Sequence, residues 1–96
     1  MTAHRLIDAT THLDRAPRWT GDSPEGESWE PCLCCDRPIR TDRRHRKVAL
    51  ADGGASFLAF DAITPETADD PAFVGLFVIG PHCARRLPAR FVRLTG

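Results

Sequence analysis

The chain has 96 residues, with 13 Lys or Arg against 13 Asp or Glu, so its formal net charge is zero. This length allows one domain, and 42% hydrophobic with 27% charged residues is the composition of a globular protein. These values exclude a multidomain enzyme, a collagen-like chain, wholesale disorder and a globally basic nucleic-acid binder. No apolar run approaches the roughly 18–20 residues that span a bilayer, and the N-terminus lacks the apolar segment of a secretory signal. We therefore expect a cytoplasmic protein with no membrane partner.

The zero net charge conceals four segregated blocks. Residues 1–31 hold six acidic residues and three Arg (net −3), and residues 32–47 hold six cations and two acidic residues (net +4). Residues 48–70 hold five acidic residues and no cation (net −5), and residues 71–96 hold four Arg and no acidic residue (net +4). A like-charged stretch is usually a solvated face. The candidate nucleic-acid-binding cations of the two basic blocks are Arg37, Arg40, Arg43, Arg44, Arg46, Lys47, Arg85, Arg86 and Arg90.

Residues 1–31 are expected to form an N-terminal arm ahead of a domain at residues 32–96. Residues 17–31 contain three Pro, two Gly and two Trp, which is typical of an irregular segment. We expect Trp19 and Trp29 to pack back onto the domain, the alternative being an exposed aromatic used in recognition. A short amphipathic helix near the start of the arm is indicated by Leu6, Ile7 and Leu13.

Four cysteines, Cys32, Cys34, Cys35 and Cys83, are the strongest chemical signal in the chain. In a chain without an export signal, clustered cysteines favour metal binding over disulfides. Adjacent Cys34 and Cys35 are also poor partners for each other, because disulfide geometry is strict. Cys32 and Cys35 form a C-x-x-C frame, whose two thiolates can bind one tetrahedral ion at about 2.3 Å. Asp36 follows at a position where a zinc knuckle turns, often in the left-handed conformation that Asp tolerates.

The segment between the cysteines is expected to form a β-hairpin. Residues 46–51 have a weak strand pattern, Asp52-Gly53-Gly54 signals a turn, and residues 56–63 follow as the second strand. An acidic loop comes next at residues 64–71, with a short helical turn beginning at Pro65.

Residues 73–79 carry apolar side chains for both faces of a strand, which predicts a buried strand. Gly80 and Pro81 then suit the cap and the first position of a helix. Cys83 would lie in the first turn of that helix, where backbone N–H groups and the helix dipole favour a thiolate. Pro88 interrupts this helix or begins the next. A shared buried face beyond it is indicated by the i, i+4, i+7 spacing of Leu87, Phe91 and Leu94.

Cys32, Cys35 and Cys83 are therefore three candidate thiolate ligands of a structural Zn²⁺ ion. The first candidate for the fourth ligand is His82, because neutral imidazole binds zinc well. It can share an ion with Cys83 only if the helix begins between the two residues. The further candidates are, in order, Cys34, His45 and, without support from the spacing, His4 and His12.

The order of a zinc knuckle, a hairpin with a third strand, and a C-terminal helix with a ligand in its first turn resembles a treble-clef zinc finger, a small zinc-stapled α+β fold. The segments CLCCDRPIR and VIGPHCARRL also resemble a group of small bacterial and phage domains with the pattern C-x-x-C-G-R-P, then a variable middle, then G-P-x-C-x-R-R-L. In this chain Asp36 replaces the usual Gly, and the middle is longer by a hairpin. The resemblance implies a zinc-binding module, and the group carries no activity to transfer.

The leading hypothesis is a small non-catalytic zinc-binding module that binds nucleic acid through its arginines, which suit bidentate phosphate contact. A zinc ion would join the two basic blocks, since Cys32 and Cys35 begin one and Cys83 lies in the other. The alternative is a protein-interaction or regulatory factor of phage or plasmid type. A thiol redox protein is less favoured, because Asp36-Arg37-Pro38 breaks the helix that such chemistry needs after C-x-x-C. No His-Glu pair at ligand spacing indicates a catalytic zinc.

Overall fold

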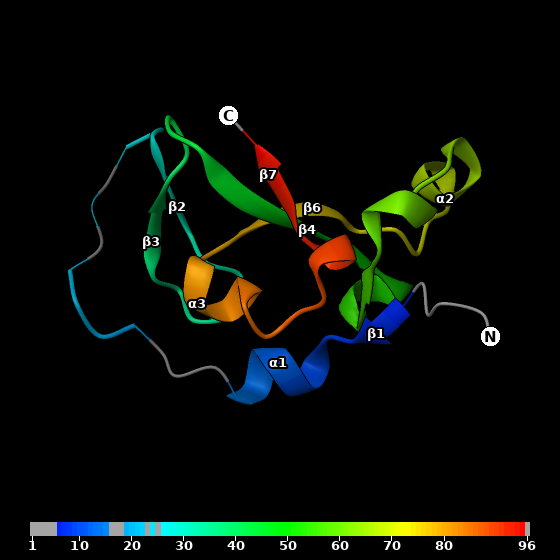
Figure 1. Ribbon diagram of the computed structural model, residues 1–96, viewed down its shortest axis with the longest axis horizontal. Helices are drawn as coiled ribbons and strands as arrows, with labels where there is room; N and C mark the ends of the chain where they lie inside the picture. Colours follow the sequence, from blue (N-terminus) through cyan, green and yellow to red (C-terminus); the bar gives the residue numbers. More distant parts are fainter. Residues whose placement is uncertain (1–5, 16–18, 23, 25, 96) are drawn as a thin grey trace.

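The computed structural model describes residues 6–15, 19–22, 24 and 26–95, and they form a mixed α+β fold (Figure 1). Its sheet strands are β1 (Leu6–Asp8), β4 (His45–Ala51), β5 (Ser56–Leu58), β6 (Gly75–Ile79) and β7 (Arg93–Thr95). A separate two-stranded hairpin consists of β2 (Trp29–Pro31) and β3 (Pro38–Arg40). The helices are α1 (Thr10–Arg15), α2 (Pro65–Asp69) and α3 (Pro81–Ala84). In this part of the chain no helix has the length and apolar character needed to cross a membrane.

Strand β4 is the centre of the sheet, and all of its pairings are antiparallel. One edge pairs with β6 along Arg46–Leu50. The other edge pairs with β7 at its beginning and with β5 at its end, and β1 extends the sheet beyond β5. This position explains the composition of β4, since Val48 and Ala49 are fully buried. The main core contains Ala9, Val48, Leu50, Phe57, Ile79, Leu87 and Phe91 together with Cys32, Cys34 and Cys83.

The expected β4–β5 hairpin is confirmed. Asp52, Gly53 and Gly54 turn the chain with φ angles of 54°, 68° and 100°, a region that favours glycine. The second strand is shorter than expected, because it ends at Leu58 and the chain makes a 3₁₀ turn at Phe60–Ala62. The expected helical turn at Pro65 is helix α2, and the Thr64 side chain caps it by accepting from the Thr67 N–H.

The expectation that residues 73–79 form a strand buried on both faces is confirmed only at the end of this segment, where Val78 and Ile79 are both buried. Only residues 75–79 form strand β6, and Val74 and Leu76 are each 46% exposed. Strand β6 lies at the end of the sheet order, so no further strand among the described residues pairs with its outer edge. The Cys-bearing loop covers only its far end, where the Leu33 N–H donates to the Val78 carbonyl at 2.9 Å.

The expectation of a buried helical face at Leu87, Phe91 and Leu94 is wrong for Leu94. Leu87 and Phe91 are buried, but Leu94 is 51% exposed. Proline has no N–H to continue a helix, and beyond Pro88 the chain makes a 3₁₀ turn and then forms β7. Strand β7 pairs with the beginning of β4, so a strand stands where the spacing predicted a helix.

The helix expected around Leu6, Ile7 and Leu13 begins later than the spacing indicated. Leu6 and Ile7 lie in β1, which pairs with β5, and helix α1 begins at Thr10. Leu13 packs against the main core, and the His12 ring meets the Phe57 ring edge-on at 5.8 Å between centroids.

Candidate metal centre

The first half of the site is the loop between β2 and β3, which folds as a tight knuckle. The Cys32 N–H donates to the Arg37 carbonyl at 2.8 Å, and the Asp36 N–H donates to the Cys32 carbonyl at 2.9 Å. Asp36 has φ of 66°, so the left-handed conformation expected at this position is confirmed. The turn carries Cys32 and Cys35 on one short loop.

The second half of the site follows β6. The Gly80 N–H donates to the Cys32 Sγ at 3.2 Å, which fastens the end of β6 to the knuckle. A Cβ atom at Gly80 would lie 3.2 Å from Ile39 Cδ1 and 3.7 Å from the Cys32 Sγ, so glycine permits this close approach. Helix α3 begins at Pro81, as expected, and Cys83 lies in its single turn.

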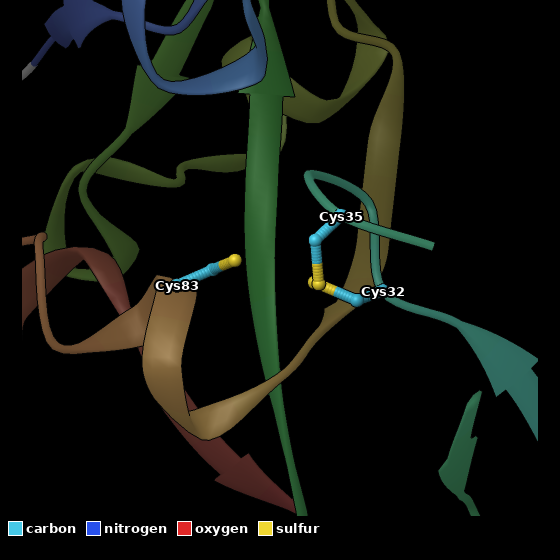
Figure 2. Close-up of side chains that lie close together, drawn as sticks. All are labelled: Cys32, Cys35 and Cys83. Carbon is cyan, nitrogen blue, oxygen red and sulfur yellow. The ribbon is translucent and has the colours of Figure 1, made fainter. Parts of the chain in front are cut away.

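These two halves bring the sulfur atoms of Cys32, Cys35 and Cys83 within 4.8 Å of one another. Figure 2 shows the Cys83 side chain pointing from α3 toward the pair on the knuckle. Cys32 and Cys83 are buried, and Cys35 is partly exposed. Tetrahedral zinc with bonds of about 2.3 Å would hold thiolates at a comparable separation. Three thiols gathered from two distant segments form a candidate metal site.

The surroundings of the thiols differ, and so do the directions of their pKa shifts. The pKa of Cys32 lies well below its usual value, chiefly because the Cys34 thiol donates a hydrogen bond to it, with help from the Gly80 N–H. Burial and the charge of Cys32 raise the pKa of Cys83. A metal ion that binds these sulfur atoms as thiolates would displace the protons they carry.

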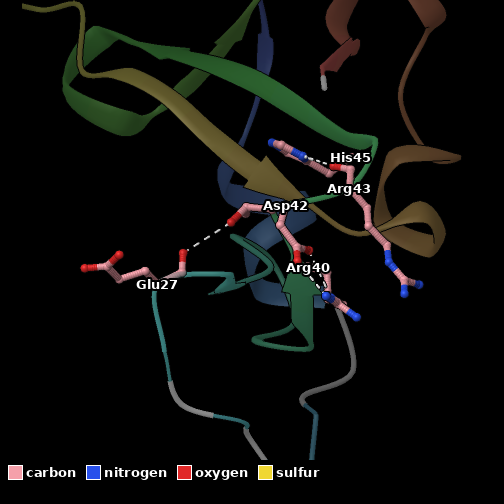
Figure 3. A network of polar contacts seen from close by, with 6 residues as sticks. Glu27, Arg40, Asp42, Arg43 and His45 are labelled. Atoms are coloured by element: carbon pink, nitrogen blue, oxygen red, sulfur yellow. Dashed lines mark hydrogen bonds and ion pairs between the residues drawn. The ribbon is translucent and has the colours of Figure 1, made fainter.

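The candidates for a fourth ligand occupy different places. Cys34 is buried beside the cluster, where hydrogen bonds to Cys32 and Cys83 and its own burial raise its pKa. His82 is exposed and lies outside the group of three close sulfurs. The buried His45 has its Nδ1 2.7 Å from the Arg43 carbonyl, as Figure 3 shows. His12 lies on α1 and contacts Phe57 of β5, and His4 lies outside the described residues.

A cavity of about 240 Å³ adjoins the cluster. Cys35 and Cys83 form part of its wall, and Pro81 and His82 of α3 form another part. The rest includes Trp19 of the N-terminal arm and two cations, Arg37 and Arg86. Sequence reasoning did not anticipate this cavity, because the contact of Trp19 with the knuckle depends on a backbone hydrogen bond from the Trp19 N–H to the Cys35 carbonyl at 2.7 Å.

Cations from the two basic blocks meet at two places. Arg37 and Arg86 line the cavity beside the cysteines. Arg46 and Arg85 line a neighbouring hollow formed by α3 and the segment that leads into β7. Among the described residues, none of these four arginines has an ion-pair partner.

The remaining candidate cations are placed differently. Arg40 donates to both carboxylate oxygens of Asp42 (Figure 3). Its guanidinium also lies over the Trp29 ring. Arg90 forms an ion pair with Asp61 at 2.9 Å. Arg43 and Arg44 are exposed in the loop before β4, and Lys47 is half-buried in β4. The structure thus brings only part of the predicted set together.

Comparisons of this chain with known protein families, with curated proteins and with solved structures found no match. The function of the protein is therefore inferred from the chemistry of the site.

Proposed function

We propose that the protein is a small non-catalytic module in which one Zn²⁺ ion fastens the knuckle to β6 and α3. The main observation behind this proposal is that the sulfur atoms of Cys32, Cys35 and Cys83 lie within 4.8 Å of one another. The lowered pKa of Cys32 supports it. All-sulfur or sulfur-rich donor sets favour zinc over hard cations. A knuckle, a hairpin with a third strand and a helical turn bearing the last cysteine fit a treble-clef-like arrangement.

The proposed ligand of this module is nucleic acid, bound through the arginines of the two basic blocks. Support comes from Arg37 and Arg86 at one hollow and Arg46 and Arg85 at the next, all without described acidic partners. Guanidinium groups recognise phosphate in a bidentate manner. Some acidic residues lie elsewhere, as at α2, where Glu66 and Asp69 face solvent.

The test is the salt dependence of binding to duplex and to single-stranded DNA of arbitrary sequence. Each phosphate neutralised contributes about −0.9 for duplex or −0.7 for single strands to the slope of log affinity against log salt. We expect slopes of about −2 to −4 from the four clustered arginines. The absence of binding to either DNA at low salt would refute this part of the proposal and leave the zinc site untouched.

A second candidate function is protein interaction, and one observation favours it. Val74 and Leu76 are both about half-exposed at the edge of the sheet, where an extended partner segment could add a strand to β6. Replacing Leu76 with Lys would abolish such a contact without touching the metal site. A protein partner that the wild-type chain retains and the Leu76→Lys variant loses would favour this function.

A further inference from the structure

The cavity beside the cysteines combines one aromatic ring with two guanidinium groups. We infer that it accepts one unpaired nucleotide of a single-stranded nucleic acid, with the base stacked on the Trp19–Arg37 pair and the phosphate bound by Arg86. This inference deepens the nucleic-acid binding proposed above and rests on it. It adds a location, a preference for single strands and a role for an aromatic residue of the N-terminal arm.

The Trp19 ring is fixed in position although it is 38% exposed. Its backbone N–H donates to the Cys35 carbonyl at 2.7 Å, and its indole Nε1–H donates to the Asp22 carbonyl at 3.2 Å. The ring also lies so close to Gly21 that a Cβ atom there would be 2.4 Å from it. An exposed ring that is held by its own backbone, its indole nitrogen and a glycine loses little freedom when a ligand binds.

The two cations of the cavity suit a nucleotide in different ways. The Arg37 guanidinium lies over the Trp19 ring at 5.2 Å from its centroid, so the two planar groups form one stacking platform. Unpaired bases stack on aromatic side chains and on guanidinium planes alike. Arg86 is exposed on the other wall and has no described ion-pair partner, which leaves its donors free for phosphate.

Charge distinguishes this cavity from the cavity beside Trp29 of the β2–β3 hairpin. Among the described residues, those that line the cavity beside the cysteines include no carboxylate. The cavity at Trp29 includes Glu30 and Asp36. An anionic ligand is therefore attracted to the first and repelled by the second.

The size of the cavity sets the preference for single strands. Its volume of about 240 Å³ lies below the roughly 300–1,000 Å³ of pockets for drug-sized ligands. It suits one base with part of its sugar and phosphate. Bases in a duplex stay stacked on their neighbours and cannot enter, so a duplex would contact only the arginines of the surface.

The experiment compares a fluorescein-labelled oligothymidylate with a hairpin duplex at the same salt concentration, using the full chain loaded with zinc. We expect Trp19→Ala to weaken oligothymidylate binding roughly 5- to 100-fold, the loss of one stacked base. We expect duplex affinity to change less than about twofold. Trp19→Phe retains a ring and should keep most of the affinity, and the matched variant Trp29→Ala should leave it within about twofold of wild type.

A second readout avoids any effect of Trp19 substitution on folding. In a Trp29→Phe protein the remaining indole is Trp19, and oligothymidylate should quench its fluorescence while the duplex does not. Arg86→Ala, at an exposed position, should weaken oligothymidylate binding and lower the salt slope by about 0.7, the contribution of one phosphate contact to a single strand.

The outcomes separate the inference from the proposed function. If both DNAs bind but oligothymidylate neither quenches Trp19 nor depends on it, the single-strand site is refuted and the arginine surface stands. An equal loss on Trp29→Ala also refutes the site. If neither DNA binds at low salt, the proposed nucleic-acid function fails, and the inference fails with it.

Discussion

Two arginine–tryptophan pairs contain an arginine of the knuckle or of the β2–β3 hairpin, and they differ in whether a carboxylate also binds the arginine. Arg37 lies over Trp19 at 5.2 Å and Arg40 lies over Trp29 at 5.6 Å. The Arg40 guanidinium is also held by both carboxylate oxygens of Asp42, which raises the pKa of Arg40 and lowers that of Asp42. No described carboxylate pairs with Arg37.

The residue types alone do not distinguish an arginine–tryptophan pair that could bind a ligand from one that stabilises the fold. The Arg40–Trp29 pair joins β2 to β3, where Trp29 and Arg40 are opposite in the strand register. It therefore stabilises the hairpin that carries the cysteines. The Arg37–Trp19 pair ties the N-terminal arm to the knuckle and shares a cavity with Arg86. The neutralised pair is structural, and the unneutralised pair is the candidate binding surface.

The largest expected effect is that of removing the metal ion. A strong chelator should lower the free energy of unfolding by several kcal/mol. The reason is that the free energy of zinc binding, about 10 kcal/mol or more in small zinc domains, contributes to folding. The Trp19 N–H donates a hydrogen bond to the Cys35 carbonyl, so unfolding of the knuckle should expose the Trp19 ring to water. The fluorescence emission of Trp19 in a Trp29→Phe protein should therefore shift to longer wavelength on chelation. Thermal unfolding and fluorescence measure both. A chelator that changes neither would contradict a metal-dependent fold.

The next effect concerns the two arginines of the cavity. The double variant Arg37→Ala with Arg86→Ala should lower the salt slope of single-stranded DNA binding by about 0.7, the contribution of the phosphate contact of Arg86, and should weaken binding further because Arg37 no longer stacks on the base. Arg40→Ala is the matched control, because its guanidinium is already neutralised by Asp42. If Arg40→Ala lowered the salt slope as much as the double variant does, the proposed difference between the two arginine–tryptophan pairs would be wrong. Fluorescence anisotropy over a salt series provides the slopes.

The candidate metal ligands could be predicted from the sequence, because Cys32, Cys35 and Cys83 lie in short motifs whose local geometry is dictated by Asp36, Gly80 and Pro81. The β4–β5 hairpin was predictable for the same reason, from its Asp-Gly-Gly turn. These features depend on neighbours in the chain. The spacing of Leu94 was misleading because its strand pairs with β4, a contact between distant segments.

The cavity beside the cysteines could not be predicted from the sequence. Its wall at Trp19 depends on a backbone bond to Cys35 and on the absence of a side chain at Gly21. Nor does the sequence distinguish Arg37 from Arg40, since the decisive carboxylate of Asp42 lies within five residues of both. Only the folded hairpin directs Asp42 toward Arg40.

A smaller effect is expected from a substitution that makes the Arg40–Trp29 pair resemble the Arg37–Trp19 pair. Asp42→Asn removes the carboxylate from Arg40 and frees its guanidinium. We expect the salt slope of DNA binding to steepen by up to about 0.7, one additional phosphate contact. The control is Asp69→Asn on α2, which changes the net charge equally but far from the hairpin. A similar gain in both variants would mean that net charge alone governs binding.

The smallest effect is expected at Gly80. Replacing it with Ala places a methyl group against Ile39 Cδ1 at 3.2 Å, and this overpacking should cost about 1 kcal/mol of stability. Ile39→Val removes the opposing atom, so the double variant should recover part of the loss. Denaturant unfolding of the two single variants and the double variant measures the coupling. Strictly additive losses would mean that this contact does not position the knuckle.

The most direct test of the account is the zinc content of the purified chain and of its cysteine variants. We predict one zinc ion per chain in the wild type and loss of zinc from Cys32→Ser, Cys35→Ser and Cys83→Ser. Cys34→Ser is the matched control, which should retain zinc if Cys34 only donates a hydrogen bond to Cys32. A wild-type chain that binds no zinc, or that keeps it without Cys83, would contradict the joining of the knuckle to α3 by a metal ion.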